Sequence, residues 1–304
     1  MSAVQTKRSA VNSWLPFCAL KPLKRVRLFC FHHAGGGASV FHRWTDELPD
    51  DIEVWPVQLP GRETRLRERP INRMAPLVKE LVQALSLHLD MPFALFGHSM
   101  GAHVAFELAR ELRRAAGLEP VHLFVAGHQA PHRKCRVPPV YGAPDGALMD
   151  RVHLLAGTPR EVLAQPGLMQ IMLPILRADL EIVETYQYVA EEPLRYPISA
   201  FWAHSDIVAD EEEALAWSAQ TTDTFKVRDL EGDHFFVHSS RHAIQRAIRE
   251  DLMATLGDVG SGRGKADVGS GRGKADVGSG RGKADVGSGR GKADVGSGRG
   301  KADV

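Results

Sequence analysis

Short apolar runs alternate with segments of helical periodicity along most of the chain. Residues 25–31 (RVRLFCF) alternate apolar and polar side chains and then become fully apolar, a pattern typical of a buried strand. Three further runs are similarly rich in β-forming residues: 52–57 (IEVWPV), 121–126 (VHLFVA) and 198–203 (ISAFWA). Helical patterns lie between them, notably over residues 75–89. This alternation predicts an α/β fold, with a mainly parallel sheet flanked by helices and functional residues at the carboxyl ends of the strands.

The interval 140–190 departs from the alternation because it contains no convincing strand. Helical patterns occur over residues 146–155, 159–164 and 169–188. We therefore expect a helical lid, inserted over the carboxyl edge of the sheet. The apolar stripe of the last helix fits a lid and fits ordinary core packing equally well; it comprises Met172, Ile175, Leu176, Leu180 and Val183.

Composition changes abruptly at Asp258, where the unit DVGSGRGKA begins and is written five times. Each unit has three glycines and one valine as its only sizeable apolar residue, so it cannot bury enough surface to offset chain entropy. We expect one domain over residues 1–257 and a disordered tail over residues 258–304. A calcium-binding β-roll is the structured alternative, but the unit lacks the required spacing of aspartate and large apolar residues.

The excess of basic over acidic residues lies in the repeats. Residues 258–304 contain ten lysines and arginines and six aspartates, a net charge of +4; the whole chain carries +1, so residues 1–257 carry −3. Such a tail can contact RNA or anionic lipid weakly, but it has no aromatic residue to stack on bases. We expect a solvated tether, with no nucleic-acid partner and no membrane partner.

The remaining 257 residues are long enough for one α/β domain with a sizeable core. The first residues contain no apolar run of signal-peptide length, and no segment approaches the ~20 apolar residues of a membrane span. Cys18, Cys30 and Cys135 cannot all pair and show no C-x-x-C spacing, which fits a reducing compartment. These features predict a cytoplasmic protein.

A candidate nucleophile lies where an apolar run gives way to a helical pattern, in the stretch LFGHSMGAHVAFELARELRR over residues 95–114. Ser99 stands between Gly97 and Gly101, which remove the Cβ atoms that would crowd a sharp strand-to-helix turn. This arrangement is the G-x-S-x-G nucleophile elbow, which exposes the serine hydroxyl at a helix N-terminus. An ordinary serine N-cap is the alternative.

A serine hydroxyl needs a base to take its proton and a third group to orient that base. In an elbow fold these partners follow in the order Ser, Asp or Glu, His. His234 follows a Gly-Asp turn near the end of the domain, and Asp206 ends the strand over residues 198–203. The sequence therefore predicts a triad of Ser99, Asp206 and His234, with Asp210 as the competing acid.

A metal site is the rival interpretation of the histidines. His234, His238 and His242 are spaced by four residues, which suits metal ligation if one helix carries all three. The preceding Gly-Asp pair places His234 before the helix instead, so we expect no metal.

An oxyanion hole requires two backbone amides, and Met100, directly after the nucleophile, supplies one of them. The loop FHHAGGGASVF over residues 31–41 follows the first strand, and its glycines allow close approach to a ligand. We expect the second amide to come from Ala34, with His33 and Phe235 as substrate-contacting walls. The rival, a phosphate loop, lacks its G-x-x-x-x-G-K-[ST] signature.

At this point the chain resembles the external, or type II, thioesterases of non-ribosomal peptide and polyketide synthases, within the α/β-hydrolase fold. The resemblance runs in order through roughly residues 14–250. It departs at His32, where proline is usual, and at Trp202 and Ala203, where a glycine pair is usual. The motifs that carry it are FHHAGGGAS (31–39), QLPGRETRL (58–66), FALFGHSMGAHVAFELAR (93–110), APH (130–132), GTPREVL (157–163) and GDHFFVH (232–238).

The resemblance implies hydrolysis of acyl groups from the phosphopantetheine arm of acyl- or peptidyl-carrier proteins, which clears stalled chains from a synthase. No metal or redox cofactor is implied, because the substrate carries the phosphopantetheine. A general carboxylesterase or an acyltransferase would use the same triad, and a non-catalytic carrier-binding protein is the rival from another class.

Basic side chains near the mouth of the site are candidate contacts for a carrier protein, since carrier proteins are typically acidic around the pantetheine. Two clusters follow strand ends, and solvated loop charges are the alternative interpretation of both. The first contains Arg62, Arg65, Arg67 and Arg69, and the second contains His132, Arg133, Lys134 and Arg136.

Overall fold

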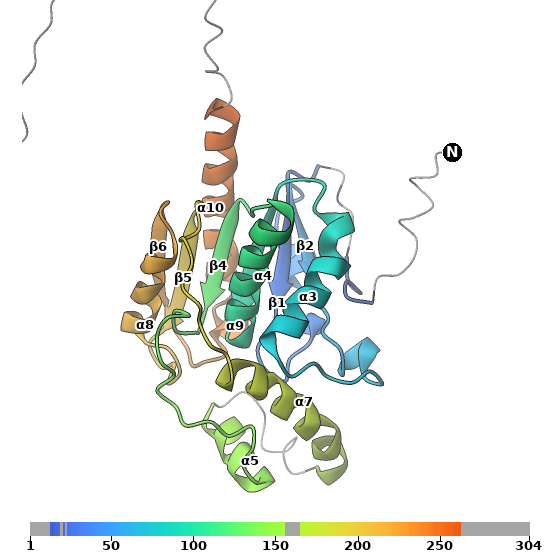
Figure 1. Cartoon of the computed structure of the whole chain (residues 1–304). Helices are drawn as coiled ribbons and strands as arrows, with labels where there is room; N and C mark the ends of the chain where they lie inside the picture. The colour runs from blue at the N-terminus through green and yellow to red at the C-terminus, as the bar shows by residue number, and fades with distance from the viewer. Residues whose placement is uncertain (1–12, 19–20, 22, 156–164, 263–304) are drawn as a thin grey trace, which may run out of the picture. The chain divides into compact units, whose positions relative to one another are not determined.

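A six-stranded, fully parallel sheet forms the centre of the molecule in the computed structural model, which describes residues 13–18, 21, 23–155 and 165–262 (Figure 1). The strand order is β2-β1-β3-β4-β5-β6. The first strand therefore lies inside the sheet, β2 is added on one side of it, and all later strands are added on the other side. The predicted sheet is confirmed. Its strands are β1 (Val26–Phe31), β2 (Ile52–Pro56), β3 (Phe93–His98), β4 (His122–Ala126), β5 (Ile198–Ala203) and β6 (Phe225–Leu230).

Helices cover both faces of the sheet. Helices α3 (Met74–Leu85) and α4 (Met100–Ala116) pack on one face, where the core includes Phe29 and Leu95. Helix α10 (Arg241–Gly262) covers the other face together with η2 (Ala38–Phe41) and α2 (Trp44–Glu47). In β1, the side chains of Phe29 and Phe31 enter the first core, and those of Leu28 and Cys30 enter the second, as strand alternation requires. The apolar runs in the sequence therefore reflect strands that are buried on both faces.

Two helices lie beyond the carboxyl ends of the strands, below the sheet in Figure 1, as predicted for a lid. They are α5 (Asp145–Leu154) and α7 (Pro166–Glu184). Leu148, Val152 and Leu176 form a small apolar core between them. The predicted helix over residues 159–164 lies outside the described residues. The last lid helix begins at Pro166, a residue that suits the first turn because its missing N–H has no intrahelical partner there.

Several short elements lie between the main strands and helices. In the region predicted as one helix over residues 75–89, the α-helix ends at Leu85 and a 3₁₀ turn follows it. The short elements are η3 (Glu63–Arg65), η4 (Ser86–His88), α8 (Glu211–Leu215), η5 (Ala216–Gln220) and α9 (Phe236–Ser239).

Helix α10 ends at Gly262, beyond the predicted domain boundary at 257, and the rest of the predicted tail lies outside the described residues. Within the described ranges, no helix combines the length and the apolar character needed to cross a bilayer.

Candidate active site

Ser99 occupies a strained turn between β3 and α4. Its φ of 54° and ψ of −121° lie in a region that side-chain-bearing residues rarely adopt. A Cβ atom at Gly97 would lie 2.0 Å from the carbonyl oxygen of Gly101, and one at Gly101 would lie 2.2 Å from the carbonyl oxygen of Phe31. The two glycines therefore allow strand and helix to approach closely enough for the turn to form.

The three residues of the predicted triad are in hydrogen-bonding contact. His234 Nε2 lies 2.9 Å from Ser99 Oγ, and His234 Nδ1 lies 3.0 Å from each carboxylate oxygen of Asp206. Asp206 Oδ1 also accepts a hydrogen bond from the amide of Val208 at 2.8 Å. With Nδ1 protonated and facing Asp206, the imidazole presents an unprotonated Nε2 to the serine, which is the arrangement that a general base requires.

Two neighbouring loops at the carboxyl edge carry the histidine and the aspartate. Asp206 lies in the turn after β5, where its amide donates to the carbonyl oxygen of Ala203 at 3.0 Å. His234 lies between β6 and α9. The amide of Ser205 donates to the carbonyl oxygen of Gly232 at 3.0 Å, which joins the two loops. Parallel pairing of β5 with β6 thus brings the acid and the base together.

The structure also bears on the two alternatives to this triad, Asp210 as the acid and a metal site at the histidines. Asp210 caps α8, accepting a hydrogen bond from the amide of Glu213 at 3.1 Å, and its carboxylate lies 2.6 Å from Arg136. Among the residues that the structure describes, no three His, Cys, Asp or Glu side chains are grouped to hold a metal ion.

The two predicted oxyanion residues border the same cavity as Ser99. Met100 is the first residue of α4, where the helix dipole favours negative charge. Ala34 lies in the loop after β1 and lines the cavity beside Ser99. The carbonyl oxygen of Ala34 lies 3.0 Å from His33 Nδ1, a contact that holds the next peptide unit, between Ala34 and Gly35. The arrangement can present amides to an oxygen that develops charge next to Ser99.

His33 and Phe235, the predicted walls, also line this cavity and pack edge-to-face with ring centroids 4.9 Å apart. Burial lowers the pKa of His33 to about 4, more than its contact with the Ala34 carbonyl raises it. Burial likewise places the pKa of His98 well below its usual range, with His234 and His33 adding to the effect. Both rings are therefore neutral near neutral pH, and the His98 ring lies beside that of His234, with centroids 5.4 Å apart.

The cavity at Ser99 has a volume of about 430 Å³ and opens beneath the lid. A second chamber of about 230 Å³ shares His33, Ala34 and Phe235 with it and extends between α5 and α7. Sequence reasoning missed most of the walls contributed by the loop after β4 and by α5, although their position at the carboxyl edge was a usable signal. These missed residues include His128, Gln129, Cys135, Val137, Arg151, Leu154 and Leu155.

The predicted docking role is wrong for Arg62 and Arg65, because both side chains are buried and paired internally. Arg62 is 4% exposed and contacts Asp179; Arg65 is 7% exposed, contacts Glu68 and stacks over the ring of Trp14. In the first cluster, the side chains of Arg67 and Arg69 are exposed.

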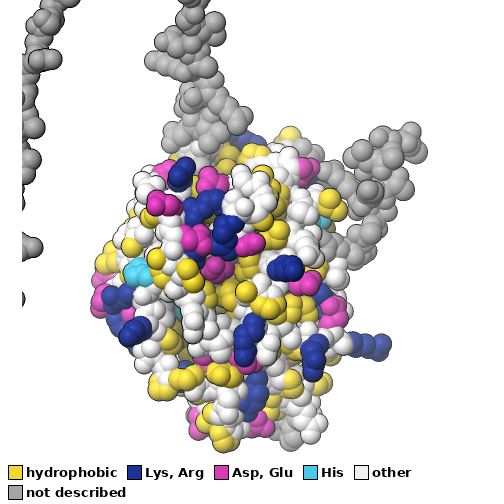
Figure 2. Space-filling view, in the orientation of Figure 1, with side chains coloured by type: hydrophobic (Ala, Val, Ile, Leu, Met, Phe, Trp, Pro, Cys, Tyr) yellow, Lys and Arg dark blue, Asp and Glu magenta, His cyan; other side chains and the backbone are white. Residues whose placement is uncertain are grey.

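The second basic cluster faces acidic residues of the protein itself. Arg133 and Arg136 form ion pairs with Glu212 and Glu213 of α8. Lys134 and Arg136 have exposed side chains. Figure 2 shows the same mixing on one face of the molecule, where many dark blue basic side chains lie beside magenta acidic ones. Pairing of this kind weakens any basic field that these arginines would present to a partner.

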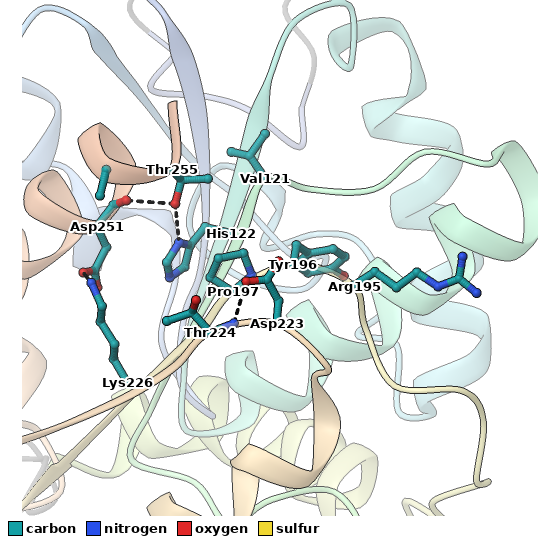
Figure 3. A pocket seen from close by; sticks show the side chains of 11 residues that line it. Val121, His122, Arg195, Tyr196, Pro197, Asp223, Thr224, Lys226, Asp251 and Thr255 are labelled. Carbon is teal, nitrogen blue, oxygen red and sulfur yellow. Dashed lines mark hydrogen bonds and ion pairs between the residues drawn. The ribbon is translucent and has the colours of Figure 1, made fainter. Parts of the chain in front are cut away.

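A larger cavity of about 560 Å³ lies at the opposite edge of the sheet, where β4, β5 and β6 begin (Figure 3). His122 lies on this cavity beside Asp251 and Thr255 of α10. The hydroxyl of Ser199, 1% exposed, donates to Asp251 Oδ2 at 2.7 Å and lies 2.9 Å from His122 Nε2. Ser199 sits within a regular strand, so this second group of serine, histidine and aspartate lacks an exposed nucleophile.

Comparison with known proteins covers the region that contains the sheet, the lid and Ser99. The thioesterase domain family matches residues 26–252. Gramicidin S biosynthesis protein GrsT of Aneurinibacillus migulanus is 40% identical over 82% of this chain and 97% of its own length. The thioesterase RedJ from the prodiginine pathway of Streptomyces coelicolor superposes with a TM-score of 0.70 at 39% identity, over 79% of this chain and 98% of its own. The type II thioesterase BorB from the borrelidin cluster gives 0.71 at 35% identity, over 78% and 96%.

Proposed function

Because the chain belongs to the thioesterase domain family, we propose that it releases acyl groups from the phosphopantetheine arm of carrier proteins that serve a peptide or polyketide synthase. Hydrolysis of an acyl thioester is the activity of the family. The observation that supports a serine mechanism is the 2.9 Å contact between His234 Nε2 and Ser99 Oγ inside the cavity.

In the proposed acylation step, Ser99 Oγ attacks the thioester carbon while His234 Nε2 takes the hydroxyl proton. The carbonyl oxygen becomes an oxyanion that accepts hydrogen bonds from the amides of Met100 and Ala34. Collapse of this intermediate breaks the carbon–sulfur bond, and the proton on His234 passes to the leaving sulfur. Asp206 stabilises the transient imidazolium and keeps Nδ1 protonated.

Deacylation reverses these roles with water as the nucleophile. His234 takes a proton from water, the hydroxide adds to the acyl carbon, and the same amides hold the second oxyanion. Collapse returns the proton to Ser99 Oγ and releases a carboxylic acid. All proton transfers are accounted for by one histidine, so the proposed cycle requires no metal or redox cofactor.

The chamber between α5 and α7 is the proposed site of the acyl chain. Its walls are mostly aliphatic, and burying methylene groups against them contributes about 0.8 kcal/mol each. The wider opening at Ser99 would then admit the pantetheine arm. The aliphatic chamber walls are Val152, Leu155, Met172, Leu176 and Leu180.

Four of the predicted docking residues have exposed side chains and remain proposed contacts for the carrier protein. They are Arg67, Arg69, Lys134 and Arg136, the last of which is also paired with acidic residues of α8.

The test is to incubate the protein with an acyl-loaded carrier protein and follow all products by mass spectrometry. We expect free acid and deacylated carrier protein in equal amounts, with a transient acyl adduct on the peptide that contains Ser99. Parallel reactions with a simple ester, and with an added alcohol, separate the alternatives. Faster turnover of the ester would indicate a carboxylesterase, transfer to the alcohol would indicate an acyltransferase, and binding without release would contradict catalysis.

A further inference from the structure

A buried ion pair joins the lid to the loop that follows β2. Arg62 Nη1 lies 2.5 Å from Asp179 Oδ2, and Arg62 Nη2 lies 2.8 Å from Asp179 Oδ1, so the contact is a two-point fork. Asp179 lies in α7 and is fully buried, and Arg62 is 4% exposed. Burying such a pair carries a desolvation cost that often cancels its attraction, so the pair alone is weak grounds for stability.

The same two side chains also hold the backbone that follows Ala34. The amide of Gly35 donates to Asp179 Oδ2 at 2.8 Å, and the carbonyl oxygen of Gly36 accepts from Arg62 Nη1 at 3.3 Å. Asp179 therefore bonds to the peptide unit directly after the proposed oxyanion amide, and Arg62 bonds to the carbonyl two residues after Ala34.

Helix α7 also packs directly on this backbone. Gly35 has a φ of +76°, and a Cβ atom there would lie 2.5 Å from Leu176 Cδ2, one of the lid residues. The positive φ favours glycine here, and any Cβ atom would require the Leu176 side chain to move. The residues that follow Gly35 are held by the loop after β2 instead, since Gln58 Oε1 accepts a hydrogen bond from the amide of Ala38 at 3.0 Å. The loop is thus held by the lid at Gly35 and by the rest of the domain at Ala38.

We propose that Arg62 and Asp179 are positioning residues that fix the Ala34 amide in the oxyanion hole and make its placement depend on the lid helix α7. This inference rests on the proposed function of the site. A displacement of α7 that carries Asp179 away removes the acceptor of the Gly35 amide, so the loop is no longer held at that position. Loss of one oxyanion donor lowers kcat by about 10²- to 10³-fold in serine hydrolases.

The test uses Arg62→Met with Asp179→Leu, because replacing both charges by apolar side chains avoids an unpaired buried ion. Asp179→Asn is the second variant, which keeps the shape of the side chain and decides the matter if the double variant does not fold. The matched control is Arg27→Met with Glu53→Leu. That pair is also buried, with Arg27 Nε 2.9 Å from Glu53 Oε2, but it joins β1 to β2 away from the loop.

Two inhibitors of the same acyl length distinguish positioning from a general loss of structure. The first is an acyl trifluoromethyl ketone, to which Ser99 adds so that the ketone oxygen becomes an oxyanion. The second replaces the carbonyl by a methylene and binds without an oxyanion. We expect both test variants to lower kcat/KM and weaken the ketone, by about 10²-fold for the double variant, while the Kd of the methylene analogue is unchanged. The control should change Tm without this selective loss.

The proposal is overturned if both test variants keep kcat/KM within about threefold of wild type. It is also overturned if the two analogues weaken equally, since that indicates a damaged pocket instead of a displaced amide. Failure of the proposed function is recognised separately. In that case the unaltered protein does not release acid from an acyl-carrier protein, or Ser99→Ala releases it normally.

Discussion

The sheet carries a serine, a histidine and an aspartate at each of two opposite edges, and the two groups are connected differently. At the carboxyl edge, His234 is the central member, with Ser99 on Nε2 and Asp206 on Nδ1. At the amino edge, Ser199 is the central member, since its hydroxyl contacts both His122 and Asp251. A histidine in the middle can carry a proton from serine to substrate, whereas a serine in the middle has its proton held by a carboxylate.

The environments of the two groups differ as much as their connections. Ser99 projects from a strained turn at a helix N-terminus into a cavity. Asp251 is neutralised by Lys226 and Arg228, each 2.7–2.8 Å away. Burial alone would raise the pKa of Asp251, and hydrogen bonds from Arg228, Lys226 and Ser199 outweigh it and lower the pKa. The cavity beside this group is the larger of the two, so cavity size and residue type together do not identify a catalytic site. What distinguishes the two groups is the order of their contacts and the backbone conformation at the serine.

Replacing the two serines should give the largest contrast. Ser99→Ala removes the proposed nucleophile, and we expect kcat on an acyl-carrier protein to fall by about 10⁴-fold or more, because the proposed covalent step is lost. Ser199→Ala leaves kcat per folded molecule near wild type but lowers the free energy of unfolding by about 1–3 kcal/mol, since two buried partners lose a hydrogen bond. Single-turnover acid release and urea denaturation measure the two effects. Comparable kcat losses in both variants would remove the distinction between the edges.

Replacing the two aspartates should give the next contrast, with a somewhat smaller loss of kcat than replacing the serines. Asp206→Asn should lower kcat by about 10⁴-fold, because an amide can hold His234 in the wrong tautomer. Asp251→Asn should mainly destabilise the fold by leaving two cations without their acceptor. Asp210→Asn serves as the control, since its partners are the α8 cap and Arg136. A kcat loss greater for Asp210→Asn than for Asp206→Asn would move the acid to Asp210.

Local sequence patterns were sufficient to predict the fold and the three residues of the carboxyl-edge group. The α/β-hydrolase prediction is confirmed, because strands buried on both faces produce apolar runs and because the elbow has its own glycine spacing. Arg62 was misplaced at the surface for a physical reason. Its partner Asp179 is 117 positions away, and an arginine in a polar loop has no local signal that it is buried.

The walls of the cavity were also beyond local prediction. The helical pattern of α7 indicated a lid, but which apolar side chains face the chamber depends on how α5 and α7 pack against each other. The amino-edge group was missed for the same reason, because His122, Ser199 and Asp251 come from two strands and a helix that meet only in the folded sheet.

The smallest expected effect concerns acid stability, to which both edges contribute. Burial lowers the pKa of His122 to about 4 at the amino edge, despite the nearby Asp251, and lowers that of His33 to about 4 at the carboxyl edge. Below pH 6.5 the unfolded chain binds a proton at each position that the folded protein does not, so stability is complete above pH 6.5 and is lost as pH falls toward 4. Each ring contributes a slope of up to about 1.4 kcal/mol per pH unit in that window.

His122→Gln and His33→Gln should each remove one such contribution from the pH dependence of the free energy of unfolding, measured by urea denaturation between about pH 5 and pH 7. The two variants should differ in catalysis, because His33 lines the cavity at Ser99 and His122 lies at the other edge. We therefore expect His33→Gln alone to change kcat/KM. An unchanged slope in His122→Gln would show that this ring already takes up its proton in the folded state. The stability at the amino edge would then depend on Asp251 and its cations, whose contribution is lost only at lower pH, below the 3.8 of an unperturbed aspartate.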